Sequence, residues 1–498
     1  MNRPIRHVAL LVIAMFLTLM VAVTSIQFFQ ASSLNADSRN VRTLYAEYGT
    51  QRGLIIVGGQ SIAKSTPTQH GPYEYQRVYT AGSLYANMTG YFATAFNSMT
   101  GLERTENDVL GGSSSSLTGQ RLQQLITGKQ PQGGAIQLTI DPAVQKAAAN
   151  ALKGQKGAVV ALDPSTGAIL AQVSEPSFDP NTLATQDSAK AQKAWKQLNA
   201  DPNRPLMNRA IAGDEYPPGS AFKIVTTAAM LEADPSLTTD SIVEAPTTWT
   251  PPGTSTSMTN YAGERCGDGS GKVKLSVAFA QSCNTTFAIA GVKLGGNALA
   301  EQAHKFFFSN QLSTPQSVTP SRFPLPESSA ALASASIGQQ DVRVTPMQMA
   351  MIAASVAHGG QMMKPYLVDR VLTADLKVAS TTNPSVLTTP ISGQTAQKIS
   401  QLMVDAVASG TGKAASIKGV SVAGKTGTAQ TGTNQAPHSW FVGFAPADNP
   451  TIALAVVVEN SGKAGSRGTG GTVAAPLARQ IIQASLASHK ADTSQNKG

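Results

Sequence analysis

The chain has 498 residues, more than one compact domain usually holds, and 41% of them are hydrophobic, which excludes global disorder. Only 13% are charged, and the net charge of +9 favours an anionic partner such as an acidic membrane or cell wall. The lysines and arginines form no basic stripe interleaved with aromatic residues, so nucleic acid is not an expected partner.

An apolar segment near the N-terminus predicts a membrane anchor. Residues 8–26 contain no charge, proline or glycine and approach the ~20 residues that cross a bilayer. Arg3 and Arg6 precede this segment, so residues 1–7 are expected in the cytoplasm. A cleaved signal peptide is the alternative, but its apolar region would be shorter, ~7–15 residues, and would end at a better cleavage site. We therefore predict a single-pass anchor at 8–29 in the cell membrane, with an extracytoplasmic body.

The body divides into two predicted domains and a tail. Residues 30–150 alternate short apolar runs with turn residues, which indicates a β-rich pedestal, and no catalytic constellation lies there. Residues 151–488 have strand-like runs at both ends and helical stretches between them. This pattern predicts an α+β fold, an antiparallel sheet assembled from distant segments and covered by helices. Residues 489–498 are polar and are expected to form a frayed tail.

The cysteine and histidine patterns predict no metal site. The two cysteines, Cys266 and Cys283, form no Cys-x-x-Cys pair, and the six histidines include no His-Glu-x-x-His. The cysteines form a disulfide or remain buried free thiols, and pairing requires Cα atoms within ~7 Å, which a sequence does not show. We expect neither a metal nor a cofactor.

The first candidate catalytic element is the run SAFK from Ser220 to Lys223, which follows Pro-Pro-Gly and opens an apolar helical stretch. Residues three apart share a helix face, so Lys223 would lie one turn from the Ser220 hydroxyl. A serine hydroxyl needs a neighbouring base, and a buried lysine crowded by another cation loses its proton readily enough to serve. The pattern alone is weak, because Ser61 and Lys64 share it by chance.

The second candidate element is Ser282-Cys283-Asn284. Alternating side chains would place Ser282 and Asn284 on one side and Cys283 on the other. A second hydroxyl near the nucleophile relays a proton to a leaving amine, and asparagine offers a donor and an acceptor to a substrate amide. By itself the tripeptide is more typical of a polar loop or cap.

The third candidate element is Lys425-Thr426-Gly427-Thr428, on a strand predicted over 420–430. Gly427 admits a substrate backbone closely, and the lysine and the two threonine hydroxyls suit a carboxylate. A backbone N–H here would pair with that of Ser220 to form an oxyanion hole. Alone, the run is as typical of an ordinary glycine-containing turn.

The three elements together, in this order and on a helix start, a loop and a strand, are the signature of penicillin-binding proteins and β-lactamases. Residues 157–485 resemble the transpeptidase domain of penicillin-binding proteins, through the runs GAVVALDPSTGAILAQVSEPSFDPN, YPPGSAFK, AQSCNTTFA, GQQDVRVTPMQMA and VAGKTGTAQ. RGLIIVGG and LTIDPAVQKAA resemble the family's pedestal and its junction. The chain looks like a class B member of the family and is similar to its actinobacterial subgroup called penicillin-binding protein A. Cys283 stands where β-lactamases of one class carry Asp, a position that varies among penicillin-binding proteins.

The resemblance implies a D,D-transpeptidase that cross-links peptidoglycan stem peptides through an acyl-enzyme and is acylated by β-lactams. Ser220 would be the nucleophile and Lys223 the general base, while Ser282 would relay protons and Asn284 would hold the substrate amide. The remaining implied roles are carboxylate binding and an oxyanion hole, by Lys425, Thr426 and Thr428 and by the backbone N–H groups of Ser220 and Thr428. A glycosyltransferase is the expected protein partner. The cell-wall synthesis that the chain serves could belong to division or to elongation.

Four other functions compete with this interpretation. A β-lactamase needs a base for the deacylating water, and the Glu-x-x-Leu-Asn motif is missing from the sequence. A β-lactam sensor needs a cytoplasmic effector, for which residues 1–7 are too short. A non-catalytic cell-wall scaffold would not need the intact motif set. A bifunctional enzyme would need a glycosyltransferase domain before the transpeptidase, and residues 30–150 are too few.

Overall fold

The computed structural model describes residues 3–30, 49–69, 73–128, 130–213, 215–432 and 435–495. Helix α1 (Arg3–Thr24) contains no buried residue, although most of its side chains are apolar. The candidate membrane span runs from Arg3 to Gln27 with a mean hydropathy of 2.6. The predicted anchor therefore lies on a helix long and apolar enough to cross a bilayer. Phe28 and Phe29 end a short π-helical turn after it, Ser25–Phe29.

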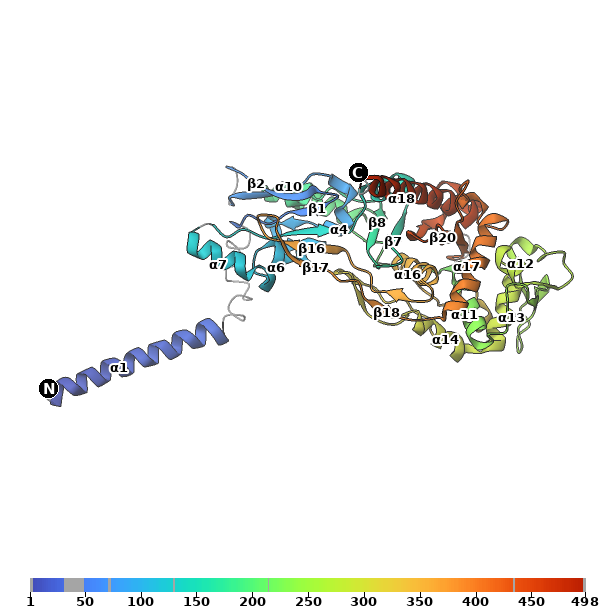
Figure 1. The fold of residues 1–498 in the computed structure, drawn as a ribbon, viewed down its shortest axis with the longest axis horizontal. Helices are drawn as coiled ribbons and strands as arrows, with labels where there is room; N and C mark the ends of the chain where they lie inside the picture. The colour runs from blue at the N-terminus through green and yellow to red at the C-terminus, as the bar shows by residue number, and fades with distance from the viewer. Residues whose placement is uncertain are drawn as a thin grey trace.

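The pedestal is built on a six-stranded mixed sheet (Figure 1). Its strands, in spatial order, are β17 (Val378–Thr381), β16 (Val368–Leu372), β6 (Ala135–Leu138), β1 (Ile55–Val57), β2 (Gln60–Pro67) and β3 (Tyr75–Tyr79). The short helices beside it are α4 (Ala86–Thr89), α5 (Gly101–Thr105), α6 (Asn107–Leu110) and α7 (Thr118–Thr127). The sheet thus takes two strands from the second half of the chain, because β16 pairs antiparallel with β6.

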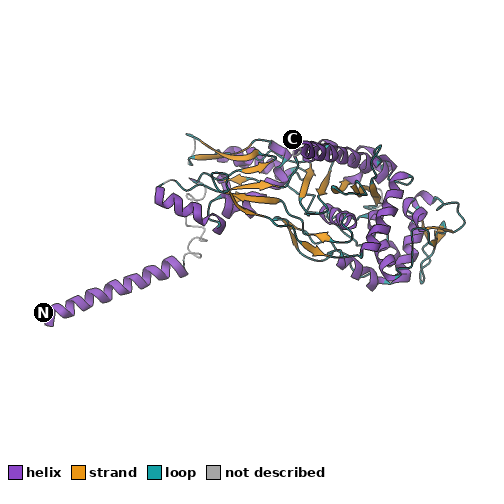
Figure 2. Ribbon diagram, in the orientation of Figure 1, coloured by secondary structure: helices purple, strands orange, loops and turns teal. Residues whose placement is uncertain are grey.

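A second sheet of five antiparallel strands forms the centre of the other half of the body, and Figure 2 shows the two groups of strands. Its order is β19 (Ala423–Ala429), β20 (His438–Ala445), β21 (Ile452–Val458), β7 (Gly157–Leu162) and β8 (Ile169–Glu175). A hairpin with Thr166 in its turn joins β7 to β8. The antiparallel sheet assembled from distant segments is confirmed, since β7 and β21 are neighbours.

Helices cover both faces of this sheet, which is why β21 is buried along its whole length. Alternate residues separate into two cores: Val457 packs in the cluster that holds helix α16 (Pro346–Ala357), and Val456 packs with the opposite helices. Those opposite helices are α8 (Pro142–Leu152) and α18 (Ala475–Gln495). Asp141 caps the start of helix α8, because its carboxylate accepts the N–H groups of Ala143 and Val144.

A helical lobe lies beside the edge strand β19 and completes the α+β fold (Figure 1). Its helices are α11 (Lys223–Ala233), α12 (Leu275–Ala280), α13 (Asn284–Leu294), α14 (Gly296–Lys305), α15 (Ser329–Ala335) and α17 (Gly393–Ala408). A two-stranded sheet of β9 (Ile242–Glu244) and β12 (Lys272–Lys274) lies against this lobe. Helices α9 (Asn181–Ala184) and α10 (Ser188–Ala200) follow β8.

Candidate active site

Ser220 lies on a short 3-10 helix, Gly219–Phe222, which leads directly into α11. Gly219 has a positive φ of 53°, and a Cβ there would approach the Thr428 carbonyl oxygen to 2.8 Å. A glycine is therefore required for this turn to pack against β19. Ser220 is half-buried, and its hydroxyl forms no hydrogen bond with any of the described residues.

Lys223 is the first residue of α11 and is completely buried. Its ammonium donates to Asn284 Oδ1 at 2.8 Å, to the Ser282 carbonyl at 2.7 Å and to Ser282 Oγ at 3.1 Å. The second motif, rather than the Ser220 hydroxyl, therefore fixes the position of the lysine nitrogen. Because Ser282 and Asn284 meet the same atom, the two side chains lie on one side of their segment, as the alternation predicts.

The segment that carries Ser282 turns sharply between α12 and α13. Ser282 has a left-handed backbone conformation with φ of 60°, uncommon for a residue with a side chain, and its N–H donates to the Phe279 carbonyl. Cys283, one residue on, forms a disulfide with Cys266, with Cα atoms 5.8 Å apart. The disulfide is thus the form that the structure adopts, and it ties the middle residue of the second motif to a separate loop.

The third motif lies on β19, at the edge of the five-stranded sheet. Lys425 is completely buried, and its ammonium donates to Ser282 Oγ at 2.8 Å and to the Thr426 carbonyl at 3.1 Å. A Cβ on Gly427 would approach the Pro218 carbonyl oxygen to 2.6 Å. This glycine therefore lets the strand lie directly against the turn that carries Ser220.

The hydroxyls of the two threonines of the third motif have partners outside β19. Thr426 Oγ1 lies 2.6 Å from Thr411 Oγ1, and Thr428 Oγ1 accepts the N–H of Gly470 at 3.2 Å. Both hydroxyls are thus already oriented by neighbours from other elements. Sequence reasoning missed Thr411 and Gly470, since neither belongs to a recognisable motif.

Two buried ammonium groups share one serine oxygen, because both lysines donate to Ser282 Oγ. No carboxylate among the described residues forms an ion pair with either of them. Burial, and then the positive charge of Lys425, hold the pKa of Lys223 well below its usual range. Burial alone lowers the pKa of Lys425 to about 7. Both effects favour the uncharged form of Lys223, which has the lone pair that a base requires.

Besides their hydrogen bonds, the two lysine nitrogens also lie near aromatic rings, which attract a positive charge. Lys223 Nζ lies 5.3 Å from the ring centre of Phe287, and Lys425 Nζ lies 5.7 Å from that of Phe279. Such contacts attract a cation only modestly, ~0.5–2 kcal/mol, so the cost of burial still prevails. The sequence signal for both residues is positional: each phenylalanine lies three residues from a member of the second motif.

A polar cluster supports the turn before Ser220. Trp440 on β20 donates its indole N–H to the Pro217 carbonyl at 3.1 Å, and its ring packs against Tyr216. The Tyr216 hydroxyl donates to Glu459 at 2.8 Å, and Arg209 pairs with the same carboxylate oxygen. These contacts hold the Tyr-Pro-Pro-Gly segment against the sheet. Their members come from two distant parts of the chain, 209–217 and 440–459, so no local pattern indicates them.

A serine at a helix start, two buried lysines and an edge strand define the class of serine acyl-transferases that work without histidine. Comparison with protein families agrees: residues 157–483 match the penicillin-binding protein transpeptidase domain, and residues 52–136 match the penicillin-binding protein A dimerisation domain. The chain therefore belongs to the penicillin-binding proteins, as a class B member.

Named relatives are similar over nearly the whole length. The chain is 44% identical to the peptidoglycan D,D-transpeptidase PbpA of Mycolicibacterium smegmatis, covering 98% of this chain and 99% of that protein. A solved structure of penicillin-binding protein A from M. tuberculosis, a ceftriaxone acyl-enzyme complex, matches with 43% identity and a TM-score of 0.84, covering 88% and 99%. A D,D-transpeptidase domain from Eggerthella lenta matches with 31% identity and a TM-score of 0.75, covering 89% and 99%.

Proposed function

We propose that this chain is a peptidoglycan D,D-transpeptidase that acts through an acyl-enzyme on Ser220. The observation that carries the proposal is the chain of contacts from Lys223 through Ser282 to Lys425. Lys223 lies three residues after Ser220, whose hydroxyl forms no hydrogen bond with the described residues. The relatives named above supply the reaction and the substrate class: peptidoglycan, and β-lactams as covalent ligands.

In the first step, neutral Lys223 takes the proton of the Ser220 hydroxyl as Oγ attacks the carbonyl carbon of the terminal D-Ala-D-Ala bond. The new C–O bond places negative charge on the carbonyl oxygen, and the N–H groups of Ser220 and Thr428 are proposed to stabilise it. The C–N bond then breaks. Ser282, in contact with both lysines, passes a proton to the leaving D-Ala nitrogen.

In the second step, an amine of another stem peptide attacks the acyl carbon. The amine loses its proton through the same lysine and serine, and the C–N cross-link forms. The ester bond between the acyl carbon and Ser220 Oγ then breaks, and Ser220 recovers its hydroxyl proton. In the proposed roles, Asn284 holds the substrate amide, and Lys425, Thr426 and Thr428 hold the terminal carboxylate of the donor peptide during the first step. A β-lactam follows the first step with its ring amide in place of the peptide bond.

We also propose a membrane anchor and a protein partner for this chain. Helix α1 is long and apolar enough to cross a membrane and supports a single-pass anchor, and the peptidoglycan substrate named for the relative supports a catalytic domain outside the cytoplasm. A glycosyltransferase that supplies nascent strands is the proposed partner, in division or in cell-shape maintenance. The exposed apolar side chains of Leu122 and Ile126 on α7 offer a pedestal surface for such a contact.

Covalent labelling with a fluorescent penicillin tests this function directly. The full-length protein should carry a stable label, and Ser220→Ala should carry none while keeping its fold. The matched control is Ser61→Ala, which removes the serine of the other Ser-x-x-Lys run and should label fully.

Two other results would replace the proposal. A label that decays within minutes would favour a β-lactamase. A folded wild type that neither labels nor cross-links a stem-peptide substrate would favour the non-catalytic scaffold.

A further inference from the structure

Besides the disulfide, two hydrogen bonds join the start of α13 to the separate segment 259–266. Asn284 donates its side-chain N–H to the Thr259 carbonyl at 3.2 Å. The next residue, Thr285, donates its backbone N–H to Asn260 Oδ1, also at 3.2 Å. The first turn of α13, which carries Asn284, is therefore held by a part of the chain outside the helix.

Asn260 supplies the cap that α13 does not supply itself. Cys283, the residue at the N-cap position, has its sulfur in the disulfide and forms no capping hydrogen bond within the part of the chain that the structure describes. Asn260 is only 7% exposed, and its Nδ2 donates to the Glu264 carbonyl at 3.2 Å, so Oδ1 is the atom that faces the helix. A side-chain oxygen in this place satisfies an N–H group that has no partner inside the helix.

The Thr259 carbonyl fixes the direction in which the Asn284 side chain is turned. A carbonyl oxygen only accepts hydrogen bonds, so the amide nitrogen of Asn284 faces Thr259 and the amide oxygen faces Lys223. An uncharged lysine nitrogen has two N–H groups and one lone pair. The two shortest contacts of Lys223, to the Ser282 carbonyl at 2.7 Å and to Asn284 Oδ1 at 2.8 Å, take both N–H groups. The lone pair then stays available for the proton of Ser220.

We propose that Asn260 is a positioning residue for the acylation step. It caps α13 from a separate loop and keeps the oxygen of Asn284 turned toward Lys223. In the opposite orientation, the amide nitrogen of Asn284 would donate to the lone pair that the base needs. Asn260 prevents this because it holds its neighbour Thr259 against the helix. The inference rests on the proposed roles of Ser220 and Lys223.

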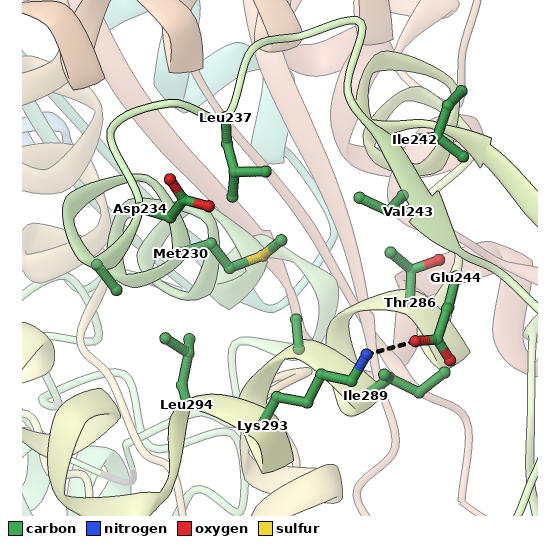
Figure 3. Close-up of a pocket in the computed structure, with 12 residues that line it drawn as sticks. Met230, Asp234, Leu237, Ile242, Val243, Glu244, Thr286, Ile289, Lys293 and Leu294 are labelled. Atoms are coloured by element: carbon green, nitrogen blue, oxygen red, sulfur yellow. Dashed lines mark hydrogen bonds and ion pairs between the residues drawn. The ribbon is translucent and has the colours of Figure 1, made fainter.

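Two control variants separate this role from a general effect on the helical lobe. At the other end of α13, Lys293 forms an exposed ion pair with Glu244 of β9 (Figure 3), and Lys293→Met removes this contact without touching the first turn. Ser328→Ala removes a cap of the same kind from α15, where the serine hydroxyl accepts the Ala331 N–H at 3.2 Å. Both variants should therefore label with penicillin like wild type.

The test is the rate of fluorescent-penicillin labelling of the full-length protein across pH 5–9, per folded molecule. Asn260→Ala should reach an alkaline plateau about tenfold below wild type, because small displacements of the reacting groups cost rate. Its acid limb should move to lower pH, since an oxygen that stabilises the charged form of Lys223 is lost. Lys425, the charged group that acts on Lys223, is unchanged in every variant. Asn260→Asp keeps the capping oxygen and should restore the plateau to within about twofold of wild type.

An Asn260→Ala protein that labels more slowly with an unmoved acid limb would overturn the inference, because the residue would then serve stability alone. If that variant does not fold, Asn260→Asp decides: its added negative charge should move the acid limb to higher pH, and an unmoved limb overturns the inference. A folded wild type that does not label overturns the proposed function and this inference with it. A labelling wild type with an unaffected Asn260→Ala overturns the inference alone, so the two failures are distinguishable.

Discussion

At the scale of single residues, the active site depends on placing two lysines where neither finds a counter-charge among the described residues. An ion pair would keep Lys223 protonated and remove the base. Instead, neutral oxygens of Ser282 and Asn284 accept its hydrogens, and Lys425 lies across the same hydroxyl. Burial, and then the positive charge of Lys425, favour the uncharged form of Lys223.

This arrangement predicts a specific pH dependence. Acylation requires neutral Lys223, so its rate should fall on acidification. Lys425 has a pKa of about 7, so it is charged in the acidic range, where its charge lowers the pKa of Lys223. Lys425→Met removes that charge, makes protonation of Lys223 easier and should move the acid limb of the labelling rate to higher pH.

The measurement is the labelling rate across pH 5–9. Lys418→Met, which replaces an exposed lysine near the same strand, is the control and should keep the wild-type profile. A uniformly slower Lys425→Met with an unmoved acid limb would show that Lys425 acts only on the substrate.

At the scale of elements, the catalytic groups come from the start of α11, the turn before α13 and the edge strand β19. Two glycines allow the closest approach, since Cβ atoms on Gly219 and Gly427 would meet backbone oxygens of the facing segment. The disulfide holds the turn before α13, because it joins Cys283 in that turn to the loop at Cys266.

Loss of this disulfide should affect both stability and chemistry. The bridge spans 17 positions, and closing a loop near this length stabilises a fold by roughly 3 kcal/mol. The double variant Cys266→Ser, Cys283→Ser should lose about that free energy of unfolding in urea. It should also label more slowly, because Ser282 must hold an unfavourable backbone conformation without the bridge.

Reductant provides the internal control for this prediction. Dithiothreitol should lower the wild-type urea midpoint toward that of the variant and leave the variant unchanged. A variant that labels at the wild-type rate would show that α13 alone fixes Ser282.

At the scale of the whole molecule, the two halves of the body are joined through shared strands. The hairpin of β16 and β17 leaves the catalytic half and extends the pedestal sheet beyond β6. We propose that 30–150 and 151–488 act as a non-catalytic pedestal and a catalytic domain. The shared strands make their connection more than a flexible linker.

The stability of the pedestal depends on a buried cluster of ion pairs. Glu103 is fully buried and pairs with Arg52 at 2.5 Å and with Arg77 at 2.7 Å. Glu103→Gln leaves two buried guanidinium groups without a counter-charge and should lower the free energy of unfolding by roughly 3–5 kcal/mol. Thermal unfolding checks this, with the exposed Glu74→Gln as control.

The same variant tests whether the pedestal affects the chemistry of the catalytic domain. If the pedestal takes no part in the chemistry, the molecules of Glu103→Gln that remain folded should label with penicillin at the wild-type rate. A slower rate per folded molecule would show that the pedestal holds the catalytic half in its active geometry.

The sequence by itself determined the features that depend on local patterns: the apolar helix α1, the cap at Asp141, the hairpin of β7 and β8, and the three short motifs. It also indicated that strands far apart in the chain share one sheet. Only the tertiary structure decided that Cys266 and Cys283 pair, that β16 and β17 extend the pedestal sheet, and that both lysines meet at Ser282. These features depend on side chains brought together from distant segments, and burial, which shifts the pKa of each lysine, exists only once those segments have packed.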